Sequence, residues 1–381
     1  NTPPTVLVPI GDVTVSEDAP DTVIDLFATF EDAENADATL VFTIVSNDNP
    51  GLFDAAVIDG VAGVLTLDYA PTTNGSANIT IRATDTGGLF VEETFQVSVH
   101  PFGPPVIDVW YGSNQAFGQL GTPQVWANIL GNVWDADGVA SLSYSLNGGP
   151  DIPLTIGPDD ARLQSPGDFN VDVAVSDLLV GENQIVLTAA DTLGNVSRET
   201  VDLAHSAGIV WPIPYSIDWS TVTNIQDVAQ VVDGQWTVAG NTVRTPTTAG
   251  YDRLLAFGDL RWSDYEVSVP VTIQATASSL NAIGFALRWP GHLADGLQPA
   301  TNPYNFGALA LYRWDGSFAR LWMASDDYVS IVQDSSGRTL ENGVTYIFKA
   351  RAETTPGIGG SLYHFKVWAE GSPEPSSWDL T

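Results

Sequence analysis

Aspartates recur at matching places in two stretches of this chain. Asp85 lies in Ala83-Thr84-Asp85-Thr86-Gly87-Gly88, and Asp191 lies 106 positions later in Ala189-Ala190-Asp191-Thr192-Leu193-Gly194. Each is followed nine positions later by a threonine that precedes a predicted strand, Thr94 or Thr200. Carboxylate oxygens are ligands that calcium prefers, whereas an aspartate before glycine or asparagine also caps tight turns. The repeat therefore predicts either cation-binding loops or ordinary turns.

A second acidic motif precedes each of these stretches. Asp32 in Phe30-Glu31-Asp32-Ala33-Glu34 corresponds to Asp135 in Trp134-Asp135-Ala136-Asp137-Gly138, an offset of 103 residues. An alternating strand pattern follows each motif. Two motifs that recur at nearly the same offset indicate two copies of one unit of roughly 100 residues, a size that suits a seven-stranded sandwich.

The charge balance restricts the partners. The chain has 46 acidic and 13 basic residues, a formal net charge of -33, and no cysteine. Nucleic acid would be repelled, and disulfides and thiolate metal sites are excluded. An excess of short carboxylates fits calcium ligation or a surface adapted to a salty medium, and both favour an extracellular or cell-surface location. No apolar run approaches the length that spans a bilayer, so we expect no membrane insertion by this segment.

The periodicity predicts an all-β fold. Apolar side chains alternate in runs such as 40–44, 77–82 and 94–99, and clusters of Gly, Pro, Asn and Asp separate the runs. We expect two sandwiches, at residues 1–101 and 102–208, joined by the proline-containing segment 101–105, which favours an extended and semi-rigid spacer. Nine of the twelve tryptophans lie beyond Ile209, and they predict a different and larger β-sandwich over 209–381.

The first hundred residues contain Asn1-Thr2-Pro3-Pro4, Ser16-Glu17-Asp18, the motif at 30–34 and the Ala-Thr-Asp-x-Gly-Gly stretch. Through these motifs they resemble bacterial cadherin-like modules, and residues 102–208 resemble a looser bacterial immunoglobulin-like form of the same sandwich. The resemblance implies bound calcium as a cofactor. The linker at 100–105 supplies no carboxylate, which departs from the cadherin pattern and argues against a complete interdomain site. The ligands that the resemblance implies are Glu17, Asp32, Glu34 and Asp85 in the first copy, and Asp135, Asp137 and Asp191 in the second.

Residues 209–381 resemble concanavalin A-like or laminin-G-like jelly-roll domains, through the stretches 261–269, 284–289 and 365–371. Such domains commonly hold sugars on one sheet, so the resemblance implies a lectin-like domain. Alternation along the predicted strands favours an aromatic and cationic platform, although large aromatic residues more often belong to a core. The candidate platform residues are Arg288, Tyr312, Trp314, Arg320 and Trp322.

No catalytic set emerges from the sequence. Enzymes of the laminarinase type carry two carboxylates on one strand as E-x-D-x-x-E, and this string does not occur. The nearest pair on one predicted strand face is Asp264 and Glu266, without a supporting neighbour. The four histidines are scattered. We therefore expect no enzymatic activity within these residues.

These observations predict a non-enzymatic extracellular adhesion or structural protein, in which calcium-stiffened repeats present a lectin-like domain to a glycan or a neighbouring protein subunit. One alternative is an accessory carbohydrate-binding region of a secreted polysaccharide-degrading enzyme. Another is a repeating subunit of an extracellular filament. The jelly-roll domain is expected to be incomplete at its C-terminal end, which would leave a strand edge open to head-to-tail self-association.

Overall fold

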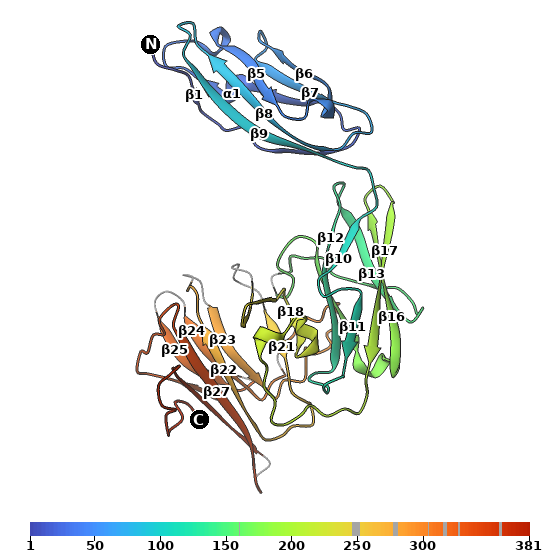
Figure 1. Cartoon of the computed structure of the whole chain (residues 1–381), viewed down its shortest axis with the longest axis vertical. Coiled ribbons are helices and arrows are strands. Elements are labelled where there is room, and N and C mark those ends of the chain that lie inside the picture. The colour runs from blue at the N-terminus through green and yellow to red at the C-terminus, as the bar shows by residue number, and fades with distance from the viewer. Residues whose placement is uncertain are drawn as a thin grey trace. The chain divides into compact units, whose positions relative to one another are not determined.

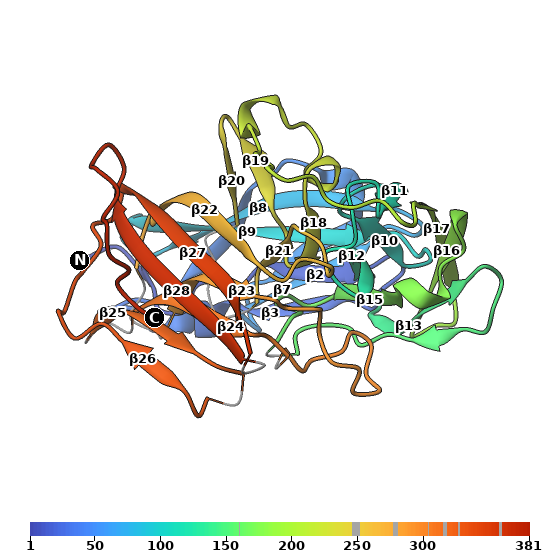
Figure 2. The same ribbon diagram turned by 90° about the horizontal axis from the view of Figure 1, so that it is seen from below.

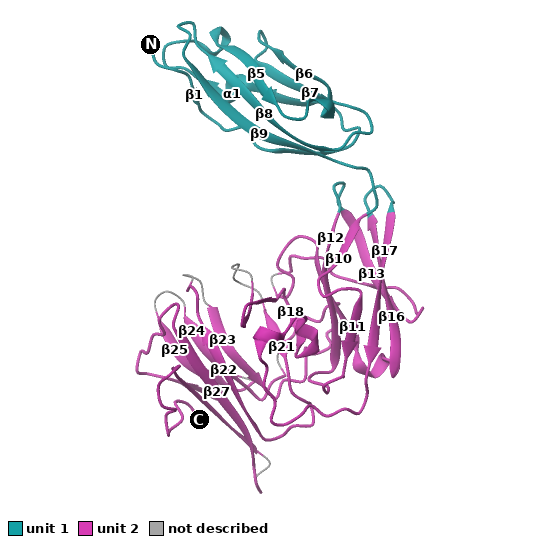
Figure 3. Cartoon of the chain, viewed as in Figure 1, with its two compact units in different colours: residues 1–104, 135–138, 191–195 teal, residues 105–134, 139–190, 196–381 magenta. Residues whose placement is uncertain are grey.

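The computed structural model describes residues 1–159, 161–245, 252–276, 281–303, 305–314, 318–326, 328–357 and 360–381. These residues form two compact units (Figure 3). The first unit contains residues 1–104, 135–138 and 191–195, and the second contains residues 105–134, 139–190 and 196–381. The predicted second and third sandwiches therefore share most of one unit. Across the described residues, no helix has both the length and the apolar character needed to cross a membrane.

The first sandwich has two main sheets and a short ribbon (Figure 1). In the four-stranded sheet, the first strand runs parallel to the last long strand and the other pairs are antiparallel. Side chains at alternating positions of both main sheets enter one core that includes Leu65, Ile79 and Ile81. The sheet orders are β2 (Val13–Ser16), β9 (Phe90–His100), β8 (Gly75–Thr84), β5 (Val41–Asn47); β3 (Thr22–Asp25), β7 (Val64–Tyr69), β6 (Phe53–Asp59); and β1 (Thr5–Val6), β4 (Phe30–Glu31).

A single helical turn, α1 (Leu26–Thr29), joins β3 to β4. Asp25 caps its first residues by accepting a hydrogen bond from the Ala28 amide at 3.0 Å. The two 3₁₀ turns of this sandwich are η1 (Asp37–Thr39) and η2 (Pro50–Leu52). All of these elements belong to loops at the ends of strands, so the all-β prediction is confirmed for this part of the chain.

The second sandwich repeats this arrangement. In the five-stranded sheet, the first strand is again parallel to the last long strand, and Gln115 pairs with Leu203. Its core includes Ile129, Val171 and Ile185. The sheet orders are β10 (Val106–Val109), β12 (Trp126–Trp134), β15 (Asp168–Ala174); and β11 (Asn114–Phe117), β17 (Val196–His205), β16 (Gly181–Asp191), β13 (Val139–Leu146), β14 (Ile152–Pro153), with the 3₁₀ turn η3 (Val175–Asp177) before β16.

The C-terminal part of the chain builds a third two-sheet core, which includes Tyr312, Phe348 and Phe365. Figure 2 shows β22, β27 and β28 side by side, as their pairing requires. The sheets are β22 (Tyr265–Thr272), β27 (Thr345–Thr355), β28 (Gly360–Ala369); and β23 (Asn281–Leu287), β24 (Ala308–Trp314), β25 (Ala319–Ala324), β26 (Ile331–Gln333).

The segment before this core does not join its sheets. It packs on the second sandwich, where Ile225, Ala229 and Val231 share a small core with Leu130 of β12. Its elements are η4 (Trp219–Thr221), η5 (Ile225–Asp227), and the ribbons β18 (Gln230–Asp233) with β21 (Leu254–Ala256) and β19 (Thr237–Ala239) with β20 (Thr242–Arg244). The second sandwich is therefore covered on one face by chain that lies beyond residue 209.

The residues after β28 fold back onto the sheet that β28 belongs to. Leu380 forms an isolated bridge with Phe365 and is buried in the third core. The ring of Trp378 stacks on His364 with centroids 5.1 Å apart, and Lys366 Nζ lies 4.7 Å from the same ring. This segment, residues 370–381, thus covers part of the sheet in place of a further strand.

We predict that Leu380→Ala destabilises the second unit by about 2–4 kcal/mol, because truncating a buried leucine removes apolar burial and leaves a cavity. Urea denaturation of the full chain would measure this free energy of unfolding. Leu362→Ala, at an exposed leucine of β28, is the matched control and is expected to cost much less. A cost for Leu380→Ala no larger than that of the control would contradict the docking of the segment.

Acid should loosen the same segment. Lys366 and Lys349 lower the pKa of Glu374 from its ordinary 4.5 to about 2. A lowered folded-state pKa contributes stability that is present above pH 4.5 and is lost as the pH falls toward 2. The protection factors of the amides of residues 370–381, which are corrected for intrinsic exchange, should therefore fall over that window. In Glu374→Gln this fall should be weaker, and an unchanged pH profile of protection in this variant would contradict the assignment.

Candidate functional site

Three aspartates converge at the ends of two loops. Asp135 and Asp137 lie between β12 and β13, and Asp191 is the last residue of β16 before the loop to β17. Their carboxylate oxygens lie within 4.8 Å of one another. Among the residues that the structure describes, no other group of three or more His, Cys, Asp or Glu side chains meets that distance. The repeat found in the sequence therefore brings Asp135, Asp137 and Asp191 together.

Hydrogen bonds within the loops hold these carboxylates in place. Asp135 Oδ1 accepts from the Asp137 amide at 2.8 Å, and Asp191 Oδ1 accepts from the amides of Leu193 and Asn195. The Thr192 hydroxyl links the two loops by donating to the Asp137 carbonyl at 2.7 Å. These are the turn contacts that aspartate commonly makes. Here the turns also fix the distance between the carboxylates.

Two carboxyl groups of the cluster have pKa values that are shifted in opposite directions. Burial, together with the charges of Asp191 and Asp137, raises the pKa of Asp135. Burial acts in the same direction on Asp191, but hydrogen bonds from Asn195, Leu193 and Gly194 outweigh it and lower the pKa of that carboxyl. Asp191 is therefore held as a carboxylate beside a second acid that resists ionisation. A cation at this position would relieve the repulsion.

The four acidic residues proposed for the first sandwich do not gather at one place. Asn74, just before β8, donates to Glu17, and Asp85, just after β8, accepts from Asn1. Because β8 has ten residues at about 3.3 Å each, its two ends lie roughly 30 Å apart. Glu17 therefore cannot ligate the same ion as Asp85. The sequence indicated that each motif lies in a loop, but it did not indicate at which end of the sandwich that loop lies.

The other three lie at one end but are engaged by donors of the chain itself. Asn1 Nδ2 donates to Asp85 at 2.8 Å, and the amide and hydroxyl of Thr2 donate to Glu34 at 2.9 and 2.8 Å. Asp32 accepts from the Asn35 side chain and from the backbone amides of Glu34 and Asn35. These hydrogen bonds lower the pKa values of Asp32 and Glu34. Asn1 and Thr2 thus provide donors to Asp85 and Glu34, whereas Asp32 is bonded by its own loop.

The five residues proposed as a glycan platform are divided between two faces. Tyr312 is 1% exposed and belongs to the third core, and Trp314 packs against the same core. Arg320 and Trp322 alternate with the core residue Leu321 and therefore lie on the other face of the sheet. Trp322 is only 7% exposed, with Arg313 over its ring at 4.7 Å.

Arg288 lies at the end of β23, with φ at +51°, and its guanidinium donates to Ser361 and to the Ser263 carbonyl. The structure therefore does not assemble the five residues into one surface. The alternation predicted for Arg320 and Trp322 is confirmed, but Tyr312 lies on the core face.

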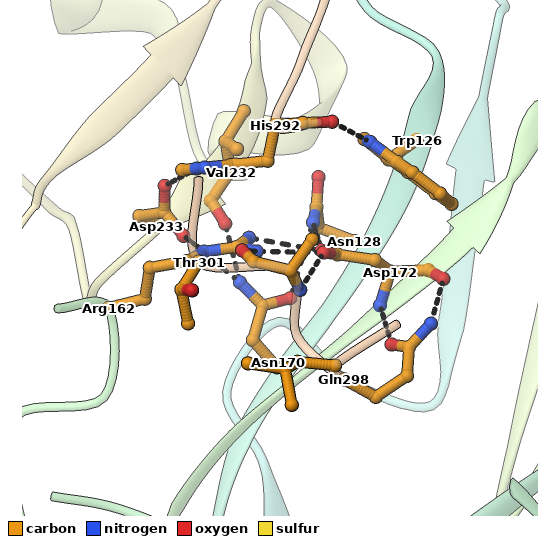
Figure 4. A network of polar contacts seen from close by, with 12 residues as sticks. Trp126, Asn128, Arg162, Asn170, Asp172, Val232, Asp233, His292, Gln298 and Thr301 are labelled. Carbon is orange, nitrogen blue, oxygen red and sulfur yellow. Dashed lines mark hydrogen bonds and ion pairs between the residues drawn. The ribbon is translucent and has the colours of Figure 1, made fainter. Parts of the chain in front are cut away.

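A buried polar network, which the sequence did not reveal, lies in the second unit (Figure 4). At its centre is Arg162, 3% exposed, in the loop between β14 and β15. Its guanidinium donates to both oxygens of Asp172 on β15, at 2.7 and 3.0 Å, and to Asp233 on β18 at 2.5 Å. One arginine thus joins the second sandwich to the segment that covers it.

The network continues on both sides of this arginine. His292 Nε2 lies 2.9 Å from the other oxygen of Asp233, and the His292 carbonyl accepts from the Trp126 indole at 2.7 Å. Gln298 makes two hydrogen bonds to the backbone of Asp172, each 3.0 Å long. The outer face of β12 and β15, which would face water in an isolated sandwich, is therefore buried by polar contacts.

The charges of this network depend on one another. Burial alone would lower the pKa of Arg162, but Asp233 and Asp172 raise it. Burial alone would raise the pKa of Asp233, whereas Arg162 and His292 lower it. The buried charges of Arg162, Asp172 and Asp233 compensate one another, so the network is stable as a set and costly to break at any one member.

No protein-family model and no curated protein sequence matches the chain. Solved structures that resemble it include the human desmocollin-1 ectodomain, at 16% identity and a TM-score of 0.29, where the match covers 56% of this chain and 38% of that one. The extracellular cadherin domains 1–4 of protocadherin gamma B7 match at 17% identity and a TM-score of 0.26, over 53% of this chain and 49% of that one. The titin fragment A168–A169 matches at 13% identity and a TM-score of 0.26, over 54% of this chain and 100% of that one. The chain thus spans less than half of the desmocollin and protocadherin chains.

Proposed function

We propose that this chain is a non-enzymatic extracellular adhesion or structural protein, whose acidic loops bind calcium and whose third sandwich, within residues 209–381, contacts a glycan or a neighbouring subunit. The observation that carries the proposal is the cluster of Asp135, Asp137 and Asp191. The excess of carboxylates behind the net charge of -33 supports an extracellular setting, where calcium is abundant. Oxygen-ligated metal can there stabilise a small domain that has no disulfide.

The donor set fits calcium. Calcium takes six to eight oxygen ligands, from carboxylates, backbone carbonyls and water. Asp135, Asp137 and Asp191 offer only oxygen, and their combined negative charge favours a divalent cation. Bound calcium would supply positive charge between the two loops, while hydrogen bonds within the loops keep the carboxylates oriented. The loops at 135–138 and 191–195 would then lose freedom relative to each other.

The contacts of Asp264 and Glu266 support a non-enzymatic function. A pair of carboxylates that hydrolyses glycosides needs one member with a raised pKa to act as the acid. Hydrogen bonds from Thr354 and Ser263 lower the pKa of Asp264. Burial would raise the pKa of Glu266, but Lys349 and Arg351 lower it. Both groups are therefore carboxylates at neutral pH and are engaged in structural contacts.

Asp135→Asn tests the proposal, because its effect on the melting temperature should change sign when calcium is added. Without calcium, the raised pKa of Asp135 means that its charged form destabilises the folded protein. This penalty is present above the folded-state pKa and is relieved as the pH falls through that pKa toward 3.8, so Asp135→Asn should melt at a higher temperature than the natural sequence in chelator at pH 7. In calcium the order should reverse, because the variant has lost a ligand.

The matched control is Asp202→Asn, which removes the same charge from an exposed position on β17. This control should respond equally in chelator and in calcium. If Asp135→Asn and Asp202→Asn show the same difference from the natural sequence in both conditions, the calcium assignment is wrong.

A further inference from the structure

A cavity of about 240 Å³ opens in the second unit, next to the buried network. It lies over β12 and β15, between the loop that precedes β15 and the turn after β18. Residues from five separate stretches of the chain form its wall. They are Trp110, Leu130, Arg162, Leu163, Gln164, Ser165, Asp168, Phe169, Asn170, Gly234, Gln235 and Arg253.

The inner wall of the cavity combines apolar and fixed polar groups. Trp110 is half-buried, and Leu130 and Phe169 are buried beside it. Asn170 is 1% exposed, with its amide donating to the Val232 carbonyl at 2.7 Å and its oxygen accepting from Asn128. The network that holds Arg162 thus also holds the inner wall rigid, as a pre-formed binding site requires.

The mouth of the cavity carries polar groups with unused hydrogen-bonding capacity. The side-chain amides of Gln164 and Gln235 and the hydroxyl of Ser165 make no hydrogen bond to any other residue that the structure describes. Gly234 has φ at +72°, and a Cβ there would collide with the Arg253 side chain. The glycine therefore allows Arg253 to pass along the cavity.

The charged groups around the cavity have both signs. Arg162 is matched by Asp172 and Asp233, and the two other charged lining residues, Asp168 and Arg253, have opposite signs. A phosphate would be repelled by Asp168, and the charge of Arg162 is already shared by two carboxylates. A neutral ligand with several hydroxyl groups would find an aromatic wall and planar amides.

We propose that this cavity binds one neutral sugar ring of a glycan. Its volume is below the range of about 300–1,000 Å³ that is usual for drug-sized ligands, which favours a single ring. The Trp110 ring can cover the apolar C–H face of a sugar, and Gln164, Ser165 and Gln235 can bond its hydroxyls. The assignment rests on the proposed glycan contact and moves it from the third sandwich to the junction with the second.

Saturation-transfer difference NMR on the full chain tests the assignment with four probes, the methyl glycosides of glucose, galactose, mannose and N-acetylglucosamine. At least one probe should receive saturation at millimolar concentration, as is expected for a small ligand with few polar contacts. Gln235→Ala should weaken its binding about tenfold. Ser165→Trp should abolish it by filling the mouth.

Gln96→Ala, at an exposed glutamine of β9, is the matched control and should bind as the natural sequence does. Transfer to none of the four probes, or transfer that persists unchanged in Gln235→Ala and Ser165→Trp, would overturn the assignment. If the chain binds a polymeric glycan but the two cavity variants bind it equally well, the adhesion proposal stands and the cavity assignment fails. If calcium also has no effect on melting, both proposals fail.

Discussion

Arg162→Met is expected to lower the free energy of unfolding of the second unit by about 3–5 kcal/mol, the usual cost of removing one partner of a buried ion pair. The reason is that Asp172 and Asp233 would remain buried without their cation, at 1% and 0% exposure. Methionine keeps much of the volume of the arginine stem, so the loss of charge dominates over a change of packing. Urea denaturation followed by tryptophan fluorescence measures the effect.

Arg198→Met is the matched control, because Arg198 is an exposed arginine on β17 of the same sandwich. Its cost should lie within about 0.5 kcal/mol of zero. The triple variant Arg162→Met/Asp172→Asn/Asp233→Asn should recover part of the lost free energy of unfolding, because it removes the unpaired charges. A cost below 1 kcal/mol for Arg162→Met alone would show that the network does not hold the unit together.

Removal of calcium is expected to lower the melting temperature of the natural sequence. A ligand that binds only the folded state stabilises it by RT ln(1 + [L]/Kd), or about 2.7 kcal/mol when its concentration is a hundred times Kd. The melting temperature of the natural sequence should therefore fall on addition of chelator and recover on addition of excess calcium. In Asp191→Asn, which removes the carboxylate with the lowered pKa, the two melting curves should coincide.

Magnesium provides the control for this second prediction. It demands a near-ideal octahedral geometry and loses its water reluctantly, so it should restore much less of the melting temperature than calcium does. Equal recovery with both cations would indicate general screening of the 46 acidic residues rather than a specific site.

The all-β fold and the acidic cluster could be predicted because both leave a local signal. Period-two alternation indicates β8 and β16, and Asp85 and Asp191 lie in corresponding motifs at the ends of these two strands. The recurring motif did not predict, however, that the two aspartates would have different contacts. The two ends differ because Asn1 and Thr2 approach Asp85 and Glu34 in the first copy, and such a long-range contact has no local signature.

The buried network could not be predicted from the same patterns. Asn128, Asn170 and Asp172 occupy alternate positions on β12 and β15, as polar residues on a water-facing sheet would. Only the arrival of Asp233 and His292 from more than fifty residues further along the chain buries them. A single arginine in the loop before β15 gave no sequence signal of its role.

The proposed platform failed as a set for a related reason. Alternation correctly separates Arg320 and Trp322 from Leu321, but it does not say which face of the sheet is the core. Tyr312 pairs with Leu321 across β24 and β25, and the two residues therefore share the core face. Aromatic residues next to cations are consistent with either face, so the burial of Tyr312 was not evident from the sequence.

Isothermal titration calorimetry of calcium into chelator-treated protein tests the central claim most directly. The account predicts saturable binding to the full chain that is lost in Asp191→Asn and retained in Asp202→Asn. Absence of saturable heat with the natural sequence, or the same isotherm with Asp191→Asn, would contradict it.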